Sequence, residues 1–263
     1  VGFDEMLREL QPGAGAQAAG IRRGYAGPPP RSLAVRSGPD RLRCASLLKP
    51  LYAWATAELV GDHERWRRHA EPAVVVSSNS DTLALWLSVG PRAVLDGIHR
   101  RTGVRWAPPN GDPSRFGSVE VSAAEVAAAY AELGQAALAG EPVAGAILEW
   151  MRLVGGDQTF GAREALAAPD AAVKCGWYGG MDETFLRTHA VGVLTPEANR
   201  VVVVVGMTAQ PYTDELERDI YQARVAEGLP VEAEHEKAGG ALLRGLLRTT
   251  LTELGELGEG SAG

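Results

Sequence analysis

Lysine is scarce in this chain: Lys49, Lys174 and Lys237 are the only lysines among 26 basic residues, and the rest are arginine. Arginine keeps its charge at any working pH, whereas burial or a neighbouring cation can make a lysine amine neutral. Each lysine that persists in such a sequence is therefore a candidate for chemistry that arginine cannot supply.

Cysteine is scarce as well, and long apolar runs are absent. Two cysteines among 263 residues imply no disulfide framework. No apolar run is long enough to span a membrane, and the run VVVVVGM (201–207) predicts a buried strand. We expect a soluble protein, either cytoplasmic or the mature form of a secreted one, and the sequence leaves the compartment open.

The net charge of −7 and the lack of a basic cluster argue against a nucleic-acid partner. The densest basic run, Arg65–Arg68, is typical of a solvated helix face. The nearby His63 and His69 lack the spacing of a zinc motif, and no glycine-rich phosphate loop is present. We therefore expect neither a metal nor a cofactor.

Apolar periodicity predicts the order of the elements. Helices are expected over 3–10, 46–59, 80–89, 91–103, 122–138, 144–154 and 234–254, and strands over 31–38, 171–179, 185–195 and 200–209. Residues 105–117 predict a loop, and 210–233 show no clear pattern.

This order favours a single α+β domain. An antiparallel sheet flanked by terminal helices would be built from about 1–45 and 161–263. An all-helical lobe of about 46–160 would be inserted between these two segments.

The stretch RCASLLKPL (43–51) places Ser46 three residues before Lys49, at the start of a predicted helix. On a helix this spacing puts both side chains on one face, and a helix N-terminus offers backbone N–H groups to an oxyanion. A desolvated lysine can serve as the base for such a serine. The alternative is structural: Ser46 caps the helix, and Lys49 extends its amine to solvent.

Two further patterns are weak on their own. Ser77 and Asn79 belong to the tripeptide SSN before a predicted helix, where an ordinary turn or cap explains them equally well. Lys174, Cys175 and Gly176 lie on an apolar strand, where a lysine is unusual and a glycine lets a substrate backbone approach. A lysine at the edge of the sheet is the alternative.

The three patterns occur in the order S-x-x-K, S-x-N and K-x-G, which resembles the serine β-lactamases and penicillin-binding proteins (DD-peptidases), and class A β-lactamases most closely. The resemblance implies the β-lactamase/transpeptidase-like fold with a reduced helical lobe. It also implies that Ser46 is the acylated nucleophile, Lys49 its base and Ser77 the proton shuttle. The substrate-binding and oxyanion residues that it implies are Asn79, Lys174, Cys175, Gly176 and Trp177.

The sequence departs from this family in the loop that carries the deacylating glutamate. Class A enzymes read R-W-E-P-E-L-N there, whereas this chain reads RWAPPNGD (105–112). On that match Ala107 replaces the glutamate that activates water, and Asn110 answers to the loop asparagine. Arg105 and Asp112 are left to pair across a shortened loop. Alanine cannot accept a proton, so efficient hydrolysis of β-lactams by the class A route is not expected.

Two further departures concern the site itself. Cys175 replaces the threonine of the motif, so a weak S–H donor stands in for the hydroxyl that binds a substrate carboxylate. The gap from Ser46 to Ser77 is 31 residues (77 − 46), roughly half of that expected in class A, which implies a more open site. Cys44 and Cys175 both fall beside the site, and whether they are bonded stays open.

Three functions remain open. The favoured one is a serine hydrolase or acyltransferase that forms an acyl-enzyme at Ser46 on an amide, ester or lactam, with a small-molecule or peptide-like substrate that bears a carboxylate. The second is a non-catalytic relative that binds a ligand or partner, and the retention of Ser46, Lys49, Asn79 and Lys174 argues against it. The third is a β-lactamase with another deacylation base, against which Ala107 is the main evidence.

Overall fold

The computed structural model describes residues 2–24, 29–179, 184–197 and 199–257. Its centre is a five-stranded sheet in the order β2-β1-β7-β6-β5, in which every neighbouring pair is antiparallel. A short two-stranded ribbon, β3-β4, lies outside this sheet. The strands are β1 (Gly15–Gly24), β2 (Arg31–Ser37), β3 (Leu42–Arg43), β4 (Glu120–Val121), β5 (Ala172–Tyr178), β6 (Phe185–Glu197) and β7 (Arg200–Pro211).

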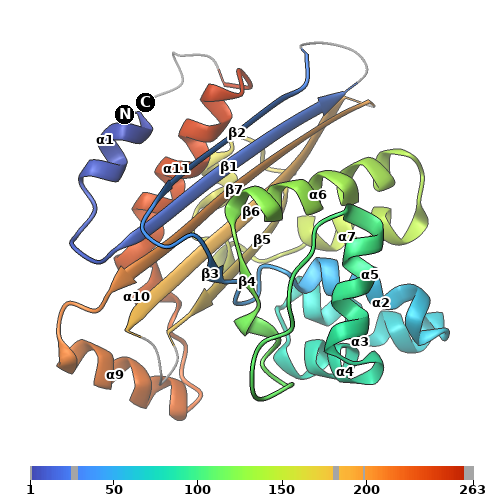
Figure 1. The fold of residues 1–263 in the computed structure, drawn as a ribbon, viewed down its shortest axis with the longest axis horizontal. Helices are drawn as coiled ribbons and strands as arrows, with labels where there is room; N and C mark the ends of the chain where they lie inside the picture. Colours follow the sequence, from blue (N-terminus) through green and yellow to red (C-terminus); the bar gives the residue numbers. More distant parts are fainter. Residues whose placement is uncertain (1, 25–28, 180–183, 198, 258–263) are drawn as a thin grey trace.

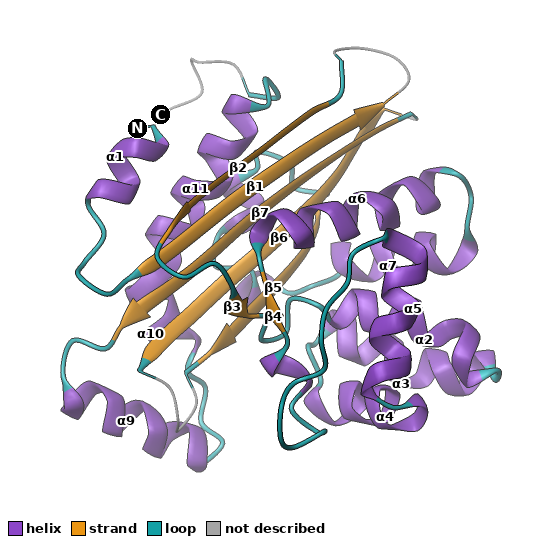
Figure 2. Cartoon of the chain, viewed as in Figure 1, coloured by secondary structure: helices purple, strands orange, loops and turns teal. Residues whose placement is uncertain are grey.

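Helices cover both faces of the sheet (Figures 1 and 2). The alternation of side chains along β7 shows the two layers, because Val203 and Val205 pack in the core under α6 (Ala123–Leu138), whereas Val204 packs with α11 (Ala241–Glu253). The first helix, α1 (Phe3–Arg8), contacts α11. The predicted α+β architecture is therefore confirmed.

The remaining helices on the α6 side form a compact group around α2. This group comprises α2 (Lys49–Val60), α3 (His63–Val75), α4 (Asn79–Val89), α5 (Pro91–Thr102) and α7 (Pro142–Arg152). Every residue of α2 from Lys49 to Thr56 is buried, and the helix contacts α3, α4, α5 and α7. A helix enclosed on all sides needs an apolar sequence throughout, which explains KPLYAWAT. The helix that follows Ser46 is thus fixed by packing.

Most of the predicted helices and strands are confirmed, but β1 was not predicted. Its sequence, GAQAAGIRRG, is rich in the alanine and glycine that strands usually avoid, yet β1 lies between β2 and β7. The small residues have a packing role, since a Cβ on Gly20 would lie 2.6 Å from Thr250 Cγ2 on α11. Close approach of the C-terminal helix therefore decides the composition of this strand.

The region after β7 also differs from the prediction. The unpatterned segment contains a helix, α9 (Glu215–Ala226), and the expected single C-terminal helix is divided into α10 (Glu232–His235), a π-helical turn (Glu236–Gly240) and α11. Shorter elements complete the chain: the 3-10 turns η1 (Phe116–Ser118) and η2 (Gly156–Gln158), and α8 (Ala162–Ala165). A capping box of Ser122 and Glu125 is present at the start of α6.

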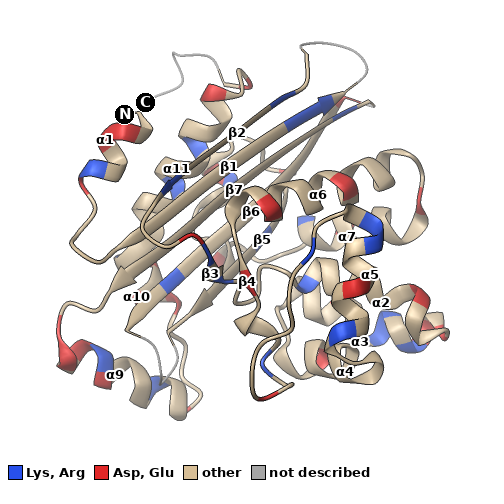
Figure 3. Ribbon diagram, viewed as in Figure 1, with Lys and Arg blue, Asp and Glu red and all other residues tan. Residues whose placement is uncertain are grey.

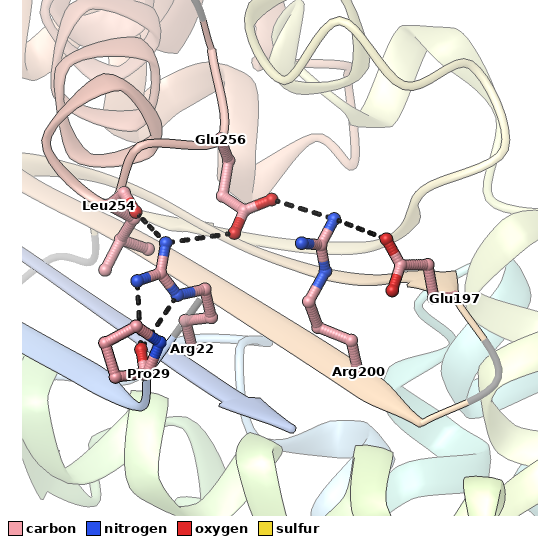
Figure 4. A network of polar contacts seen from close by, with 6 residues as sticks. All are labelled: Arg22, Pro29, Glu197, Arg200, Leu254 and Glu256. Atoms are coloured by element: carbon pink, nitrogen blue, oxygen red, sulfur yellow. Dashed lines mark hydrogen bonds and ion pairs between the residues drawn. The ribbon is translucent and has the colours of Figure 1, made fainter. Parts of the chain in front are cut away.

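Two arginines hold the chain after α11 against the sheet (Figure 4). Arg22 of β1 donates to the carbonyl oxygens of Leu254 and Pro29 and lies 3.5 Å from Glu256. Arg200 of β7 lies 3.4 Å from the other carboxylate oxygen of Glu256. Arg200 also lies 3.5 Å from Glu197, so the carboxylates of Glu256 and Glu197 together balance the charge of the two largely buried arginines.

Elsewhere, acidic and basic residues are interspersed along the helices, as the view in Figure 3 shows. No helix in the described part of the chain is both long and apolar enough to cross a membrane.

Candidate active site

Ser46 lines a cavity of about 340 Å³ that also takes in Ser77, Asn79 and the end of the edge strand β5. It lies in the turn before α2, directly after Ala45, whose φ of 50° is in the left-handed region. Hydrogen bonds from Cys44 N to Val119 O and from Ala45 N to Gly117 O, both 2.9 Å, hold this turn. Ser46 is therefore not the helix cap, because α2 begins at Lys49 and Leu48 takes the cap position.

Lys49 is the first residue of α2 and is completely buried. Its Nζ donates to the backbone oxygen of Ser77, and lies 2.8 Å from Asn79 Oδ1 and 3.2 Å from Ser77 Oγ. Burial, together with the nearby charge of Lys174, holds the pKa of Lys49 well below its usual value. The amine is thus neutral over a wider pH range than an exposed lysine.

Lys174 reaches the same serine from the sheet. Its Nζ donates to Ser77 Oγ at 2.9 Å and to the backbone oxygen of Cys175 at 3.1 Å. Burial lowers the pKa of Lys174 to about 8. Ser77, whose φ of 55° is also left-handed, therefore holds its hydroxyl between two buried amines.

Gly176 brings β5 against the turn that carries Ser46. A Cβ at this position would lie 2.7 Å from the backbone nitrogens of both Ser46 and Leu47. No side chain fits there without moving the backbone, so glycine is required for this close approach. Trp177, the next residue, lines the cavity and packs edge-to-face on Phe160 with ring centroids 5.3 Å apart.

The structure therefore brings Ser46, Lys49, Ser77, Asn79 and Lys174 together from three places in the chain. Comparisons with known proteins bear on the fold that does this. No protein-family model and no curated protein matches the sequence. Solved structures, in contrast, match along most of the chain.

The structure of PBP-A has a TM-score of 0.66 at 16% identity, covering 97% of this chain and 96% of that one. A variant of the class A β-lactamase of the last common ancestor of Gram-negative bacteria has a TM-score of 0.60 at 17% identity, covering 95% of each chain. A β-lactamase from Chitinophaga pinensis DSM 2588 has a TM-score of 0.58 at 16% identity, covering 82% of this chain and 92% of that one.

The chain has the β-lactamase and PBP-A fold. The family resemblance predicted from the three motifs is thereby confirmed at the level of the fold.

The loop before α6 reaches the cavity of Ser46 through residues other than those expected from the sequence. Ala107 and Asn110 line a neighbouring cavity with Arg41 and Arg43, not the cavity of Ser46. The loop residue beside the buried amine is Phe116, whose ring centroid is 5.5 Å from Lys49 Nζ. An aromatic ring thus stands where the loop approaches Lys49.

Arg105 and Asp112 do not pair with each other among the described residues. Asp112 instead accepts the backbone N–H of Ser114 at 2.8 Å. Hydrogen bonding by the Ser114 side chain, and then by its backbone, lowers the pKa of Asp112, with a smaller contribution from the charge of Arg115. The carboxylate of Asp112 therefore closes a local turn with Ser114 and does not tie the loop together through Arg105.

Both cysteines are free thiols and fully buried. The Sγ of Cys175 donates to the backbone oxygen of Thr159 at 3.4 Å and packs with the core beside α11, so this side chain does not line the cavity. Cys44 packs beside Tyr52 and Phe116. Burial raises the pKa of each thiol to about 12, which keeps both protonated and unreactive.

Several cavity-lining residues were not predicted from the sequence, and those with large or polar side chains include Arg115, Phe116, Tyr178 and Glu232. Arg115 and Phe116 follow residues 105–112, the part of the loop that matches the class A motif. Glu232 lies in a segment without a recognisable pattern, and nothing in the sequence indicates that it reaches the site. No cluster of three or more metal-ligand side chains is found in the parts of the chain that the structure describes.

Proposed function

We propose that the protein is a serine acyl-enzyme, a hydrolase or acyltransferase in which Ser46 attacks an amide, ester or lactam carbonyl. The observation that carries this proposal is the hydroxyl of Ser77, held between the amines of Lys49 and Lys174 at 3.2 and 2.9 Å. Two lysines buried around one serine hydroxyl are costly to stability, and an active site accounts for that cost better than a structural role does.

The hydrogen bonds of Lys49 favour a base. A neutral amine has two N–H donors and one lone pair. The carbonyl oxygen of Ser77 and the amide oxygen of Asn79 can only accept, so they take the two N–H groups. The lone pair is left to accept a proton from a hydroxyl, which is the task of a general base.

The hydrogen bonds of Ser77 favour a proton shuttle. Lys174, charged at neutral pH, can only donate, so the oxygen of Ser77 accepts from it. The same oxygen can accept a proton from Lys49 while the hydroxyl proton of Ser77 is donated to the leaving group. During acylation, the Ser46 O–H bond breaks as its oxygen bonds to the substrate carbonyl. The proton passes to Lys49 and then through Ser77 to the leaving nitrogen or oxygen.

The oxyanion of the tetrahedral intermediate would meet backbone N–H groups. The N–H of Ser46 has no backbone acceptor within the described chain, and β5 is an edge strand with one row of backbone groups not used by β6. We assign the second donor to the backbone N–H of Trp177. This residue lines the cavity and directly follows Gly176, which lies against the turn that carries Ser46. Such fixed donors stabilise the developing charge.

Hydrolysis of the acyl-enzyme would be slow. Asp112, the acidic residue of the loop between α5 and η1, is engaged with Ser114 and does not line the cavity. Without a loop carboxylate to activate water, the acyl group persists or passes to an amine acceptor. A PBP-A mutant has been captured as an acyl-enzyme with penicillin G, and we expect an acyl-enzyme of this kind to accumulate here.

A labelling time course tests this proposal. The wild-type chain and Ser46→Ala are incubated with a fluorescent penicillin and with a fluorophosphonate, and turnover of a chromogenic cephalosporin is followed in parallel. A persistent adduct on the wild type alone, with slow turnover, supports the proposal. Rapid cephalosporin turnover would instead indicate a β-lactamase with another base, and absence of any adduct would indicate a non-catalytic protein.

A further inference from the structure

The segment between β7 and α11 contributes an acidic side chain to the cavity. α9 and α10 lie beyond one end of the sheet (Figure 1), and Glu232, the first residue of α10, lines the same cavity as Ser46 and Trp177. It is the only carboxylate among the described residues that line this cavity. Arg115 is the one basic residue among those that line the cavity in the described chain, and the amines of Lys49 and Lys174 lie behind Ser77, whereas the acid comes from a separate element.

The backbone that carries Glu232 is held firmly on both sides. Val231, just before it, packs in one cluster with Tyr221 of α9 and Trp177 of β5. His235, three residues after it, is buried and forms hydrogen bonds through Nε2 with the hydroxyl of Tyr221 at 2.9 Å and through Nδ1 with Thr188 Oγ1 at 3.1 Å. The carboxylate is thus presented from a fixed position near Trp177.

Glu232 differs from the acidic residues that follow it because its carboxylate forms no ion pair with any described residue. Glu234 pairs with Arg224 at 3.0 Å and Glu236 with Arg244 at 2.6 Å. Glu232 forms no ion pair or hydrogen bond with any residue in the described ranges, although its side chain is half-buried. An unpaired, partly desolvated carboxylate in a ligand cavity is complementary to a positively charged group.

We infer that Glu232 is a specificity-determining residue that binds an ammonium or guanidinium group on the substrate, at the Trp177 end of the cavity. The inference rests on the proposed function and narrows its substrate to a peptide-like molecule with a cationic group. The amines behind Ser77 would then face the opposite charge on the same substrate.

The test uses two alkyl fluorophosphonates that are identical except for a terminal ammonium or a terminal hydroxyl. The rate at which Ser46 is phosphonylated by each probe, with loss of fluoride, is measured in the wild type, in Glu232→Gln and in Glu227→Gln. Glu227 is an exposed residue at the end of α9, and its replacement changes the net charge equally. We expect the wild type and Glu227→Gln to prefer the ammonium probe by about 5-fold, and Glu232→Gln to lose this preference. The rate with the hydroxyl probe should stay unchanged.

A binding measurement distinguishes failure of this inference from failure of the proposed reaction at Ser46. Calorimetric binding of the two corresponding phosphonic acids, which cannot react, is compared in Ser46→Ala with and without Glu232→Gln. A cation preference that depends on Glu232 in this background supports the inference even if Ser46 never reacts. Equal binding of the two ligands, a preference that survives Glu232→Gln, or an equal slowing of both fluorophosphonates would overturn it.

Discussion

The amine of Lys174 lies 2.9 Å from the hydroxyl oxygen of Ser77, although 97 positions separate the two residues in the chain. This contact joins the edge strand of the sheet to the start of α4. With Lys49 on the other side of the same hydroxyl, it forms a chain of three proton-carrying groups in a buried setting. The chemistry of the site depends on which of the two lysines is charged.

The acylation rate is expected to fall as pH rises through about 8, the value to which burial lowers the pKa of Lys174. Above that pH Lys174 loses the charge that keeps the pKa of Lys49 low and that donates to Ser77. Stopped-flow acylation by a fluorescent penicillin, followed from about pH 5 to about pH 10, measures this basic limb. Lys174→Arg, which keeps its charge, should lack the limb, and a flat wild-type profile across this range would contradict the assignment.

Replacing Lys174 by methionine should stabilise the folded chain while abolishing fast acylation. The folded pKa of Lys174, about 8, lies below the 10.5 of an ordinary lysine, so between these values the unfolded chain binds more protons. The free energy of unfolding therefore rises with pH across this window. At neutral pH, Lys174→Met should raise it by about 2 kcal/mol and reduce its slope with pH.

Urea titrations at several pH values check this stability prediction. Lys237→Met is the control, because Lys237 is exposed and its replacement removes an equal charge. It should leave the slope unchanged. Equal slopes in the wild type and in Lys174→Met would show that burial of this amine carries no cost.

Gly176→Ala should damage both stability and acylation. The added methyl group would lie 2.7 Å from the backbone nitrogens of Ser46 and Leu47, so the turn must move, at a cost of about 1–3 kcal/mol. Gly145→Ala on α7 is the matched control, because its Cβ meets nothing within 4 Å, and it should gain up to about 1 kcal/mol in helix propensity. Thermal melts with acylation rates distinguish the two, and a tolerated Gly176→Ala would refute the close approach.

A carboxylate introduced on the loop should act only at the position that faces the site. Phe116→Glu would place an acid beside Lys49 in the cavity of Ser46, and we expect the acyl-enzyme to decay at least about 10-fold faster. Ala107→Glu places the same group in the neighbouring cavity and should leave the lifetime unchanged. Decay of the fluorescent adduct gives both values. Faster decay in Ala107→Glu alone would restore the loop match made from the sequence.

The cluster of Ser46, Lys49, Ser77, Asn79 and Lys174 could be predicted because its chemistry restricts residue type and order. The rarity of lysine also made the cluster recognisable, because two of the three lysines in the chain belong to it. The position of Cys175 could also have been anticipated. Side chains alternate along a strand, so with Lys174 and Gly176 turned toward the site, the residue between them faces the other layer.

The remaining features depend on packing that local patterns do not record. β1 contains alanine and glycine because α11 approaches it closely, and this contact joins segments at opposite ends of the chain. Phe116 and Glu232 reach the cavity from a loop and from a one-turn helix, where no periodicity marks a buried face. Such residues become visible only once the elements are placed in space.

The most direct test of the acyl-enzyme is to locate the adduct. The wild type and Ser46→Ala are incubated with penicillin G, quenched with acid, weighed intact by mass spectrometry and then digested for peptide mapping. We predict one added penicilloyl group per wild-type chain, on the peptide that contains Ser46, and none on Ser46→Ala. An adduct elsewhere, or none on the wild type with this or any other acyl probe, would contradict the role of Ser46 as the nucleophile.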